Sequence, residues 1–442
     1  MKVLKFGGTS VGSADRIKHI KDLICTPEKK IVVLSAMAQT TDTLVAIVNY
    51  LYQQNTESAQ EVINELKENY YNVLESLITS EQFLEKGKAI IADHFHYIHS
   101  FTKDVFTIYE ERAILAQGEL LSSALMQLYL EEQGCHSVLL PALNFMRVDK
   151  DQEPDYFYIR ENLERELKQY PDVNLFITQG YICRNAYGEI DNLRRGGSDY
   201  TASLIGAELK ADEIQIWTDI DGMRNNDPRV VDQTRPIEHL SFEEAAELAY
   251  FGAKILHPSS ISPAKLANIP VRLKNTWKPE AFGTLITGST EKHGIKAIAA
   301  KDGITAIKIK SGRMLMAYGF LRRIFEVFEV FNTSIDMIAT SEVSVSVTID
   351  NTSQLEKILR ELKKYGTVEV EPGQTIVCVV GDFIAESKGY ASRIFHQLKH
   401  TPIRMISYGG SRHNISLLIK TTDKKNALEA LNGLFGLGDM KE

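Results

Sequence analysis

Residues 2–12 read KVLKFGGTSVG, and the rest of the chain is organised around this stretch. Val3, Leu4 and Phe6 predict a buried strand, Gly7 and Gly8 break it, and residues 14–24 carry apolar positions at helical spacing. A strand, a glycine turn and a helix N-terminus in this order direct backbone N–H groups and the positive end of a helix dipole toward an anion. The stretch lacks the Walker and dinucleotide-binding glycine patterns, so taken alone it predicts either an anion site or a plain tight turn.

The bulk composition is that of an ordinary globular protein. The chain has 442 residues, of which 44% are hydrophobic and 24% charged, and its net charge is −8. An acidic chain of this kind argues against a nucleic-acid or anionic-membrane partner. The four cysteines have no metal-ligand spacing, so we expect buried free thiols in a reducing compartment. No signal peptide or membrane-spanning run is recognisable, and we expect a cytoplasmic protein.

Further apolar runs at residues 30–35, 173–178 and 213–218 predict strands that alternate with helices. This alternation is typical of an α/β layer fold with a mostly parallel sheet, in which ligands bind at the carboxyl ends of the strands. A second glycine turn, RRGGSDYT at residues 194–201, opens another helix. Its cation, glycines, hydroxyl and carboxylate suit an anionic ligand, although a helix capped by Ser198 or Asp199 is the simpler alternative.

The character of the sequence changes near residue 295. Residues 323–325 and 393–395 both read RIF, and the sequence around them is repeated after about 70 residues. Each copy reads strand, helix, strand, strand, helix, strand, which predicts two ferredoxin-like α+β units. Such sheets keep edge strands that can pair with another copy.

The chemistry that these features suit best is phosphoryl transfer. Its transition state is stabilised mainly by positioning and by cations around the transferring group. Lys5 lies in a strand predicted to be buried on both faces, where a lysine is unusual, and Lys254 is a second candidate cation. A helix C-terminal charge is the alternative reading of Lys254.

Seven motifs in order resemble the aspartokinase family across the whole chain. They are KFGGTSV (5–11), the loop at 35–42, Gly118-Glu119, RGGSDYT (195–201), WTD (217–219), DPR (227–229) and FGAKILHP (251–258). The resemblance implies an amino-acid kinase domain at residues 1–294, a first ACT regulatory domain at 303–372, and a second at 295–302 and 373–442. It also implies ATP-dependent phosphorylation of the side-chain carboxylate of L-aspartate to 4-phospho-L-aspartate, with ATP and Mg²⁺. That reaction is the first step of lysine, threonine and methionine biosynthesis.

The same resemblance assigns residue roles in the kinase domain. The catalytic group is Lys5, Asp199 and Lys254, with the lysines neutralising the transferring phosphoryl group and Asp199 orienting them. The substrate would be held by Ser35, Thr41, Glu119, Arg195 and Ser198, where Arg195 meets the α-carboxylate and Glu119 the α-ammonium. The nucleotide would be held by Lys5, Gly7, Gly8, Thr9, Ser10, Thr218, Asp219, Asp227, Arg229 and Lys254. No protein-bound metal is expected.

The regulatory match is to the lysine-inhibited type, whose effector sits between the first ACT domains of two subunits. The matched positions are Met314, Ala317, Gly319, Phe320, Leu321, Ile335, Asp336, Ser341 and Glu342. Asp336 and Glu342 are the acids that would hold the amino groups of a lysine. The resemblance therefore implies a homodimer, with a tetramer as the alternative.

Three positions depart from the family pattern, namely Arg194 beside Arg195, Arg224 near the base, and Ala317 in place of an effector-site serine. Two other functions stay open at this point: a glutamate-type acylphosphate-forming kinase, and a silent amino-acid-sensing subunit. Glu119 and the tandem ACT repeats argue against the first. The presence of Lys5, Asp199 and Lys254 argues against the second.

Overall fold

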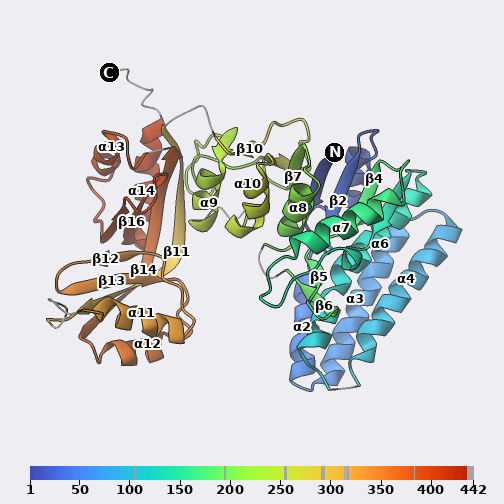
Figure 1. Ribbon diagram of the computed structural model, residues 1–442, viewed down its shortest axis with the longest axis horizontal. Coiled ribbons are helices and arrows are strands. Elements are labelled where there is room, and N and C mark those ends of the chain that lie inside the picture. Colours follow the sequence, from blue (N-terminus) through green and yellow to red (C-terminus); the bar gives the residue numbers. More distant parts are fainter. Residues whose placement is uncertain are drawn as a thin grey trace. The chain divides into compact units, whose positions relative to one another are not determined.

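The computed structural model describes residues 1–103, 105–193, 196–252, 256–289, 294–312, 314, 318–382 and 384–435. The chain forms two compact units (Figure 1). The first comprises Met1–Met223, Glu238–Phe242 and Ile255–Ser289, and the second Arg224–Ile237, Glu243–Lys254 and Thr290–Glu442. The predicted fold class, a mostly parallel α/β layer with ferredoxin-like α+β units, is confirmed. Among the described residues, no helix is long and apolar enough to cross a membrane.

An eight-stranded sheet is the centre of the first unit, in the order β3-β4-β2-β1-β7-β9-β10-β8. Strands β1 to β4, β7 and β9 run parallel, and β10 is antiparallel to β9. The strands are β1 (Lys2–Phe6), β2 (Lys30–Leu34), β3 (Ser137–Leu140), β4 (Leu175–Gln179), β7 (Glu213–Thr218), β8 (His239–Ser241), β9 (Val271–Asn275) and β10 (Thr284–Thr287). A small hairpin pairs β5 (Ile182–Arg184) with β6 (Ile190–Asn192).

Strand β1 lies between β2 and β7, and this position fixes where the glycine turn falls. In the register of the sheet, Lys5 is opposite Val33 on one side and Ile216 on the other. Every residue of β2 is buried, as expected for a parallel strand covered on both faces. The carboxyl ends of β1, β2, β4, β7 and β9 therefore meet at one edge of the sheet.

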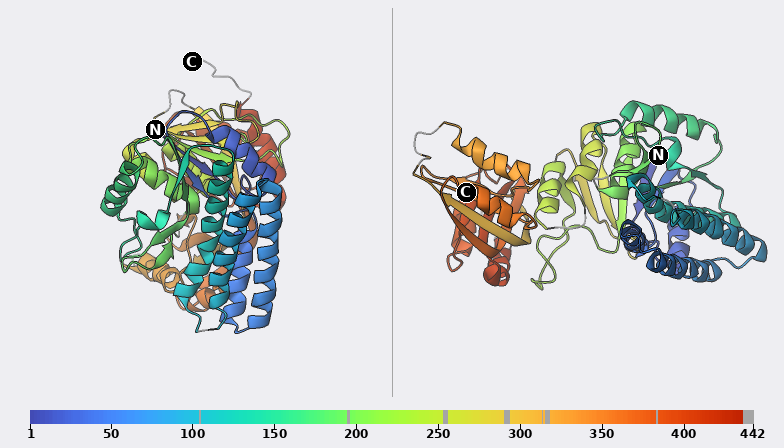
Figure 2. Two further views of the ribbon diagram at one scale, coloured as in Figure 1. Left: turned by 90° about the vertical axis from the view of Figure 1, so that its right-hand side faces the viewer. Right: turned by 90° about the horizontal axis from the view of Figure 1, so that it is seen from below.

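Helices cover both faces of this sheet, and α3 and α4 run side by side as a long pair (Figures 1 and 2). Apolar residues at helical spacing bury one stripe of each, as Ile63, Leu66, Tyr70 and Leu74 do on α3. The helices are α1 (Ala14–Ile24), α2 (Thr40–Tyr52), α3 (Thr56–Leu77), α4 (Glu81–Ser100), α5 (Ile108–Leu115), α6 (Gln117–Glu132), α7 (Tyr156–Lys168), α8 (Gly197–Glu208) and α10 (Ser262–Ala267). Short 3-10 turns cover Ala142–Asn144 and Pro258–Ile261.

The second unit contains most of α9 (Phe242–Tyr250) and a six-stranded antiparallel sheet in the order β12-β13-β11-β14-β16-β15. Its elements are β11 (Gly294–Lys310), α11 (Phe320–Val330), β12 (Ile338–Thr340), β13 (Ser344–Ile349), α12 (Leu355–Leu362), β14 (Thr367–Asp382), α13 (Tyr390–Gln397), β15 (Met405–Tyr408), β16 (Asn414–Lys420) and α14 (Lys424–Asn432), with 3-10 turns at Thr421–Asp423 and Gly433–Phe435.

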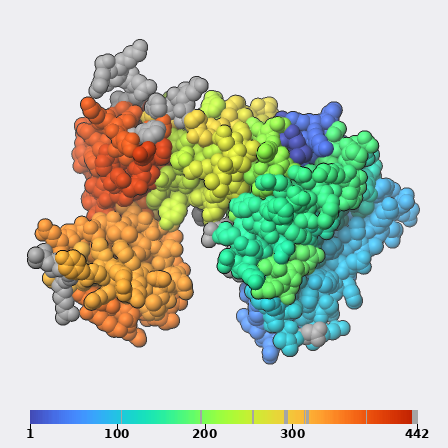
Figure 3. All heavy atoms as spheres, viewed as in Figure 1, coloured from blue at the N-terminus to red at the C-terminus, as the bar shows by residue number. Residues whose placement is uncertain are grey.

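The two long strands of this sheet are shared by both sequence repeats. The first half of β11 pairs with the second half of β14, and the second half of β11 pairs with the first half of β14 and with β13. The register shifts near Gly303, where the backbone has φ +77°. Each repeat keeps its own core, one around Ile324 and Val347 and the other around Ile394 and Leu417. The two halves are the adjoining orange and red lobes of Figure 3.

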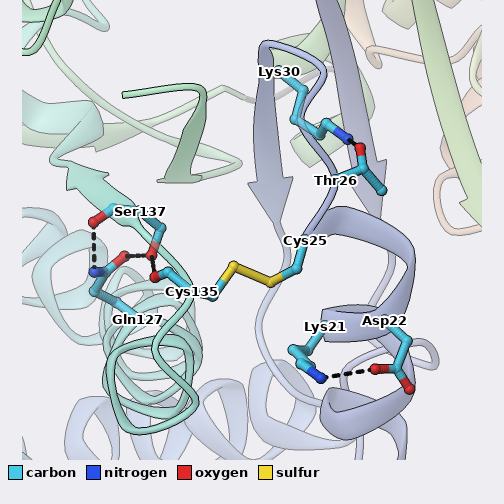
Figure 4. Close-up of a disulfide and its surroundings, with 8 residues drawn as sticks. All are labelled: Lys21, Asp22, Cys25, Thr26, Lys30, Gln127, Cys135 and Ser137. Carbon is cyan, nitrogen blue, oxygen red and sulfur yellow. Dashed lines mark hydrogen bonds and ion pairs between the residues drawn. A yellow bond between two sulfur atoms is a disulfide. The ribbon is translucent and has the colours of Figure 1, made fainter. Parts of the chain in front are cut away.

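The expectation of four free thiols is wrong for two of them. Cys25, directly after α1, is disulfide-bonded to Cys135, between α6 and β3, across 110 residues of sequence (Figure 4). Cys183 and Cys378 are free and buried. The bonded pair lines an open cavity of about 440 Å³ together with Lys21, His136 and Asp172. The disulfide thus ties together the C-terminal ends of α1 and α6.

Reduction of this disulfide should lower the stability of the first unit. A disulfide typically stabilises a folded protein by about 2–4 kcal/mol, mainly by restricting the unfolded chain. We expect the double variant Cys25→Ser/Cys135→Ser to unfold at a lower temperature than the oxidised wild type, as measured by circular dichroism. Dithiothreitol should lower the wild-type melting temperature and leave that of the double variant unchanged. Equal melting temperatures for the oxidised and reduced wild type would show that the bond contributes nothing.

Candidate active site

An ion pair lies where the two glycine turns meet. Lys5, near the end of β1, places Nζ 2.7 Å from Oδ1 of Asp199 in the first turn of α8. The two side chains are only 13% and 15% exposed. The contact is a charge pair and not an aligned hydrogen bond, because Asp199 Oδ1 has no partner among the described residues that satisfies hydrogen-bond geometry. The ammonium group of Lys5 is therefore held at the edge of the sheet and is mostly shielded from water.

The first glycine turn is tightly closed. The backbone N–H groups of Ser10 and Val11 both donate to the Gly7 carbonyl, at 2.9 and 3.3 Å. A Cβ on Gly8 would lie 2.9 Å from the Ala36 carbonyl oxygen, so this position needs glycine. The backbone of the turn is thus pressed against the loop that follows β2.

The hydroxyl groups of this turn differ in their surroundings. Ser10 is 2% exposed, and its Oγ lies 2.9 Å from Thr276 Oγ1 beyond the end of β9. Thr9 is exposed. Ser13 accepts a hydrogen bond from the Arg16 N–H and caps α1. Of the two predicted phosphate-binding hydroxyls, that of Thr9 faces solvent and that of Ser10 is held inside the protein.

The second glycine turn caps α8 without using its polar side chains. Gly196 is the N-cap, with φ +71°, and the helix begins at Gly197. A Cβ on Gly196 would lie 2.5 Å from that of Ser260, which again requires glycine. The alternative that Ser198 or Asp199 caps this helix is therefore wrong, and both side chains can take part in the site.

Three serines connect the ends of β2, α6 and α8. Ser35 Oγ donates to Ser198 Oγ at 2.9 Å, and Ser122 Oγ donates to the Ser35 carbonyl at 2.8 Å. Gly180, at the end of β4, lies so close that a Cβ there would come within 2.3 Å of Ser198. Ser35 and Ser198, both predicted to bind substrate, thus meet at the same edge of the sheet as Lys5.

Glu119, in the first turn of α6, is a carboxyl group buried beside this cluster. It is 5% exposed, and burial raises its pKa from 4.5 to about 7, against the opposing effects of a hydrogen bond from the Ala36 backbone and the charge of Lys5. Burial removes water from a carboxyl group and so disfavours its charged form. A positively charged group that binds beside Glu119 would favour the ionised form of its carboxyl group.

The other predicted site residues of the first unit are more exposed to solvent. Thr218 ends β7 next to the first glycine turn, and its Oγ1 donates to Asp219 Oδ1 at 3.1 Å. Asp219 is exposed, as is Thr41 in the first turn of α2. Among the described residues, no cluster of three or more His, Cys, Asp or Glu is placed to hold a metal ion.

Asp227 and Arg229, predicted to line the nucleotide site, belong to the second unit. Arg229 makes a two-point contact with Asp227, with Nε–Oδ1 at 2.9 Å and Nη2–Oδ2 at 2.8 Å, and these bonds lower the pKa of the Asp227 carboxyl. Arg224, which departs from the family pattern, donates to Thr234. Lys254 and Arg195, with Arg194, lie outside the described residues.

Sequence reasoning missed Tyr181. It follows Gly180, has φ +65° although it is not glycine, and its N–H donates to Thr201 Oγ1 at 2.9 Å. Burial, followed by the charge of Glu119, raises the pKa of its hydroxyl to about 12. Residues with strained backbone angles cluster at functional sites, and Tyr181 is such a residue near Glu119, the carboxyl group predicted to bind the substrate. The Gly-Tyr pair directly after a buried strand was the available signal.

The comparisons with known proteins agree with this arrangement. Residues 1–275 match the amino acid kinase family, and residues 377–435 match an ACT domain. The chain is 33% identical over 469 residues to aspartokinase 1, chloroplastic, of Arabidopsis thaliana, covering all of this chain and 81% of that one. It is 33% identical over 454 residues to lysine-sensitive aspartokinase 3 of Escherichia coli, covering 97% and 98% of the two chains.

Solved structures extend the likeness to three dimensions. E. coli aspartokinase III in complex with lysine and aspartate superimposes with a TM-score of 0.84 at 32% identity, covering 98% of this chain and 99% of that one. The same enzyme in complex with aspartate and ADP gives a TM-score of 0.83 at 32% identity, covering 98% and 100%.

Fold and site define a kinase of the amino-acid kinase class with ACT regulatory repeats. Within that class, the chain belongs to the aspartokinase family.

Replacing Glu119 by glutamine should change how stability depends on pH. Because the folded-state pKa (about 7) is above the ordinary value of 4.5, wild-type stability decreases relative to Glu119→Gln as the pH rises from 4.5 to 7, and the gap stays constant above pH 7. We expect the stability difference to shift by about 2–4 kcal/mol in favour of the variant between low and neutral pH, and urea unfolding between pH 5 and 8 should detect most of this shift. The exposed Glu342→Gln is the control. If the difference in free energy of unfolding between the two proteins did not change with pH, the pKa of Glu119 would not be raised in the folded protein.

Proposed function

We propose that this aspartokinase transfers the γ-phosphoryl group of magnesium-bound ATP to the side-chain carboxylate of L-aspartate. The observation that carries the proposal is the Lys5–Asp199 pair between two glycine turns at the carboxyl edge of the sheet. The attacking carboxylate oxygen forms a bond to the γ-phosphorus while the bond to the β,γ-bridging oxygen breaks, and ADP leaves. The attacking carboxylate is already ionised at neutral pH, so no general base is required.

The chain's own residues supply charge and orientation for this transfer. The ammonium of Lys5 offsets the negative charge on the transferring group, and Asp199 keeps that ammonium in place. Gly7 to Ser10, with the N-terminus of α1, favour phosphate charge nearby. Thr218, Asp219, Asp227 and Arg229 complete the nucleotide assignment, and Lys254 is proposed as the second cation.

The substrate is held by groups on the other side of Lys5. Glu119 pairs with the α-ammonium of aspartate, which favours the ionised form of the carboxyl group. Ser35, Ser198 and Thr41 offer hydroxyl groups, and Arg195 is the proposed partner of the α-carboxylate. Mg²⁺ enters with the nucleotide, since this ion is commonly bound by substrate phosphates with few protein ligands.

We further propose feedback inhibition by lysine at the first ACT repeat. The E. coli relative is named lysine-sensitive, and its structure was solved with lysine. The proposed positions lie between the end of β11 and the start of β13. They are Met314, Gly319, Phe320, Leu321, Ile335, Asp336, Ser341 and Glu342, while Ala317 lies outside the described residues. Glu342 is exposed, and the Asp336 side chain is 1% exposed.

Assembly into homodimers through the ACT sheet is also proposed, with a tetramer as the larger alternative. The edge strands β12 and β15 carry exposed apolar side chains, with Ile338 46% and Ile406 45% exposed. Edge strands of this kind are suited to association with a second copy.

The substrate assignment is tested by comparing two acceptors. ADP release, measured with a coupled assay at equal ATP, should depend on L-aspartate and remain at background with L-glutamate. Glutamate is longer by one methylene group, so its carboxylate overshoots the phosphoryl group when its ammonium is held by Glu119. Equal rates with the two amino acids would favour the glutamate-type kinase, and no rate with either would favour the silent sensing subunit.

Lys5→Met should lower kcat by at least about 100-fold, because one charge that stabilises the transition state is removed. The double variant Lys5→Met/Asp199→Asn serves as the matched control, since it also removes the carboxylate left without a partner. We expect the double variant to recover thermal stability and to remain inactive. A kcat of Lys5→Met within about fivefold of wild type would refute the assigned role of Lys5.

A further inference from the structure

A second charge cluster is centred on the acid proposed to hold the effector. Lys301 Nζ lies 2.7 Å from Asp336 Oδ1 and 2.9 Å from Asp350 Oδ2, and the Tyr250 hydroxyl donates to the same Asp336 oxygen at 2.9 Å. The Lys301 ammonium also lies 4.7 Å from the centre of the Tyr250 ring. All four residues belong to the second unit. We call Tyr250, Lys301, Asp336 and Asp350 the Asp336 cluster.

The cluster is one positive charge short of balance. It contains two carboxylates and one ammonium, and the Asp336 side chain is 1% exposed. Among the described residues, Oδ2 of Asp336 has no hydrogen-bond partner although it is buried. Leaving a buried carboxylate oxygen without a hydrogen-bond donor costs free energy. A further cationic donor bound at Oδ2 would therefore stabilise the cluster.

The two resident donors keep their protons at neutral pH. Burial opposes the charge of Lys301, yet its hydrogen bonds to Asp336 and Asp350 raise its pKa. Burial, and then the charge of Asp336, raises the pKa of the Tyr250 hydroxyl to about 12. Lys301 therefore presents to Asp336 the same chemical group, a primary ammonium, that a lysine effector would present.

We infer that Lys301 and Tyr250 set the threshold for feedback inhibition by competing with the ammonium of the effector for Asp336. A cation at Oδ2 reduces the negative charge that Oδ1 offers, and it repels Lys301. Both effects weaken the Tyr250 hydrogen bond. The inference rests on the proposed function, which names Asp336 as an effector-binding acid.

The structure also shows what that bond holds in place. Tyr250 is the last residue of α9, and Gly252 follows with φ +128° against β11, where a Cβ would lie 2.4 Å from the Ala300 carbonyl. The end of α9 is thus attached to β11 at Ala300 and Lys301, beside the effector acid. In the sequence this segment leads directly into the stretch that contains Lys254.

The test uses the full-length protein and free L-lysine. Initial rates with magnesium ATP and aspartate are measured against lysine concentration for the wild type and Tyr250→Phe. Because the variant lacks the bond that the effector must weaken, it should be inhibited at a lysine concentration lower by about fivefold or more. Its kcat and KM without lysine should remain within about twofold of wild type. Titration calorimetry with lysine should show the same shift in Kd.

Tyr408→Phe is the matched control, because its hydroxyl also donates a hydrogen bond in the second unit, to the Ala385 carbonyl, away from the Asp336 cluster. It should leave lysine inhibition unchanged. Lys301→Met, which removes the competing ammonium, should lower the inhibitory concentration further than Tyr250→Phe does.

An unchanged or raised inhibitory concentration in Tyr250→Phe, with a wild type that lysine does inhibit, overturns this inference and leaves the proposed function intact. A wild type that phosphorylates aspartate but ignores lysine overturns the effector assignment and this inference together. A wild type with no aspartate-dependent rate overturns the proposed function itself.

Discussion

The position of β1 between β2 and β7 is the constraint on which the catalytic unit depends. Parallel pairing on both sides fixes the register, so the chain must leave β1 at Gly7 and turn at the same edge where β2, β4 and β7 end. That edge then collects the beginning of α1, α6 and α8, three helix N-termini whose dipoles favour negative charge. Lys5 and Asp199 add one formal charge of each sign at that point. A negatively charged substrate and a negatively charged transferring group are both served by this arrangement.

Features that depend on residues close in sequence could be predicted, whereas those that depend on distant segments could not. The glycine turn, the Ser13 cap and the buried strand β2 depend on neighbouring residues and are predictable from spacing. The capping of α8 by Gly196 was not predicted, because the preference of serine and aspartate for N-caps pointed to Ser198 or Asp199. The positive φ at Gly196 and its close approach to Ser260 are visible only in the structure. The local rule failed where close packing from a distant segment required glycine.

The disulfide and the Asp336 cluster illustrate the limit more sharply. Cys25 and Cys135 are 110 residues apart, and no spacing pattern marks them as partners. Tyr250 and Asp336 are 86 residues apart, and Tyr250 reads as one more aromatic residue at the end of an amphipathic helix. Sequence reasoning named Asp336 as an acid for an external amine, and it had no means to see the internal amine already beside it. Lys301 pairs with Ile376 of β14, while the later part of β11 pairs with β13, which ends at Ile349 just before Asp350.

Glu119 and Asp336 are both proposed to bind an ammonium group, and they differ in the charges around them. Glu119 is buried, and burial raises its pKa to about 7 against the charge of Lys5, so the substrate ammonium that we propose as its partner would favour its charged form. The Asp336 side chain is buried beside the Lys301 ammonium, with which the proposed effector amine must compete. The first arrangement favours binding of a substrate that must be captured. The second, through the competition that we propose, would set a concentration below which an effector has no effect, which is the property that a feedback sensor requires.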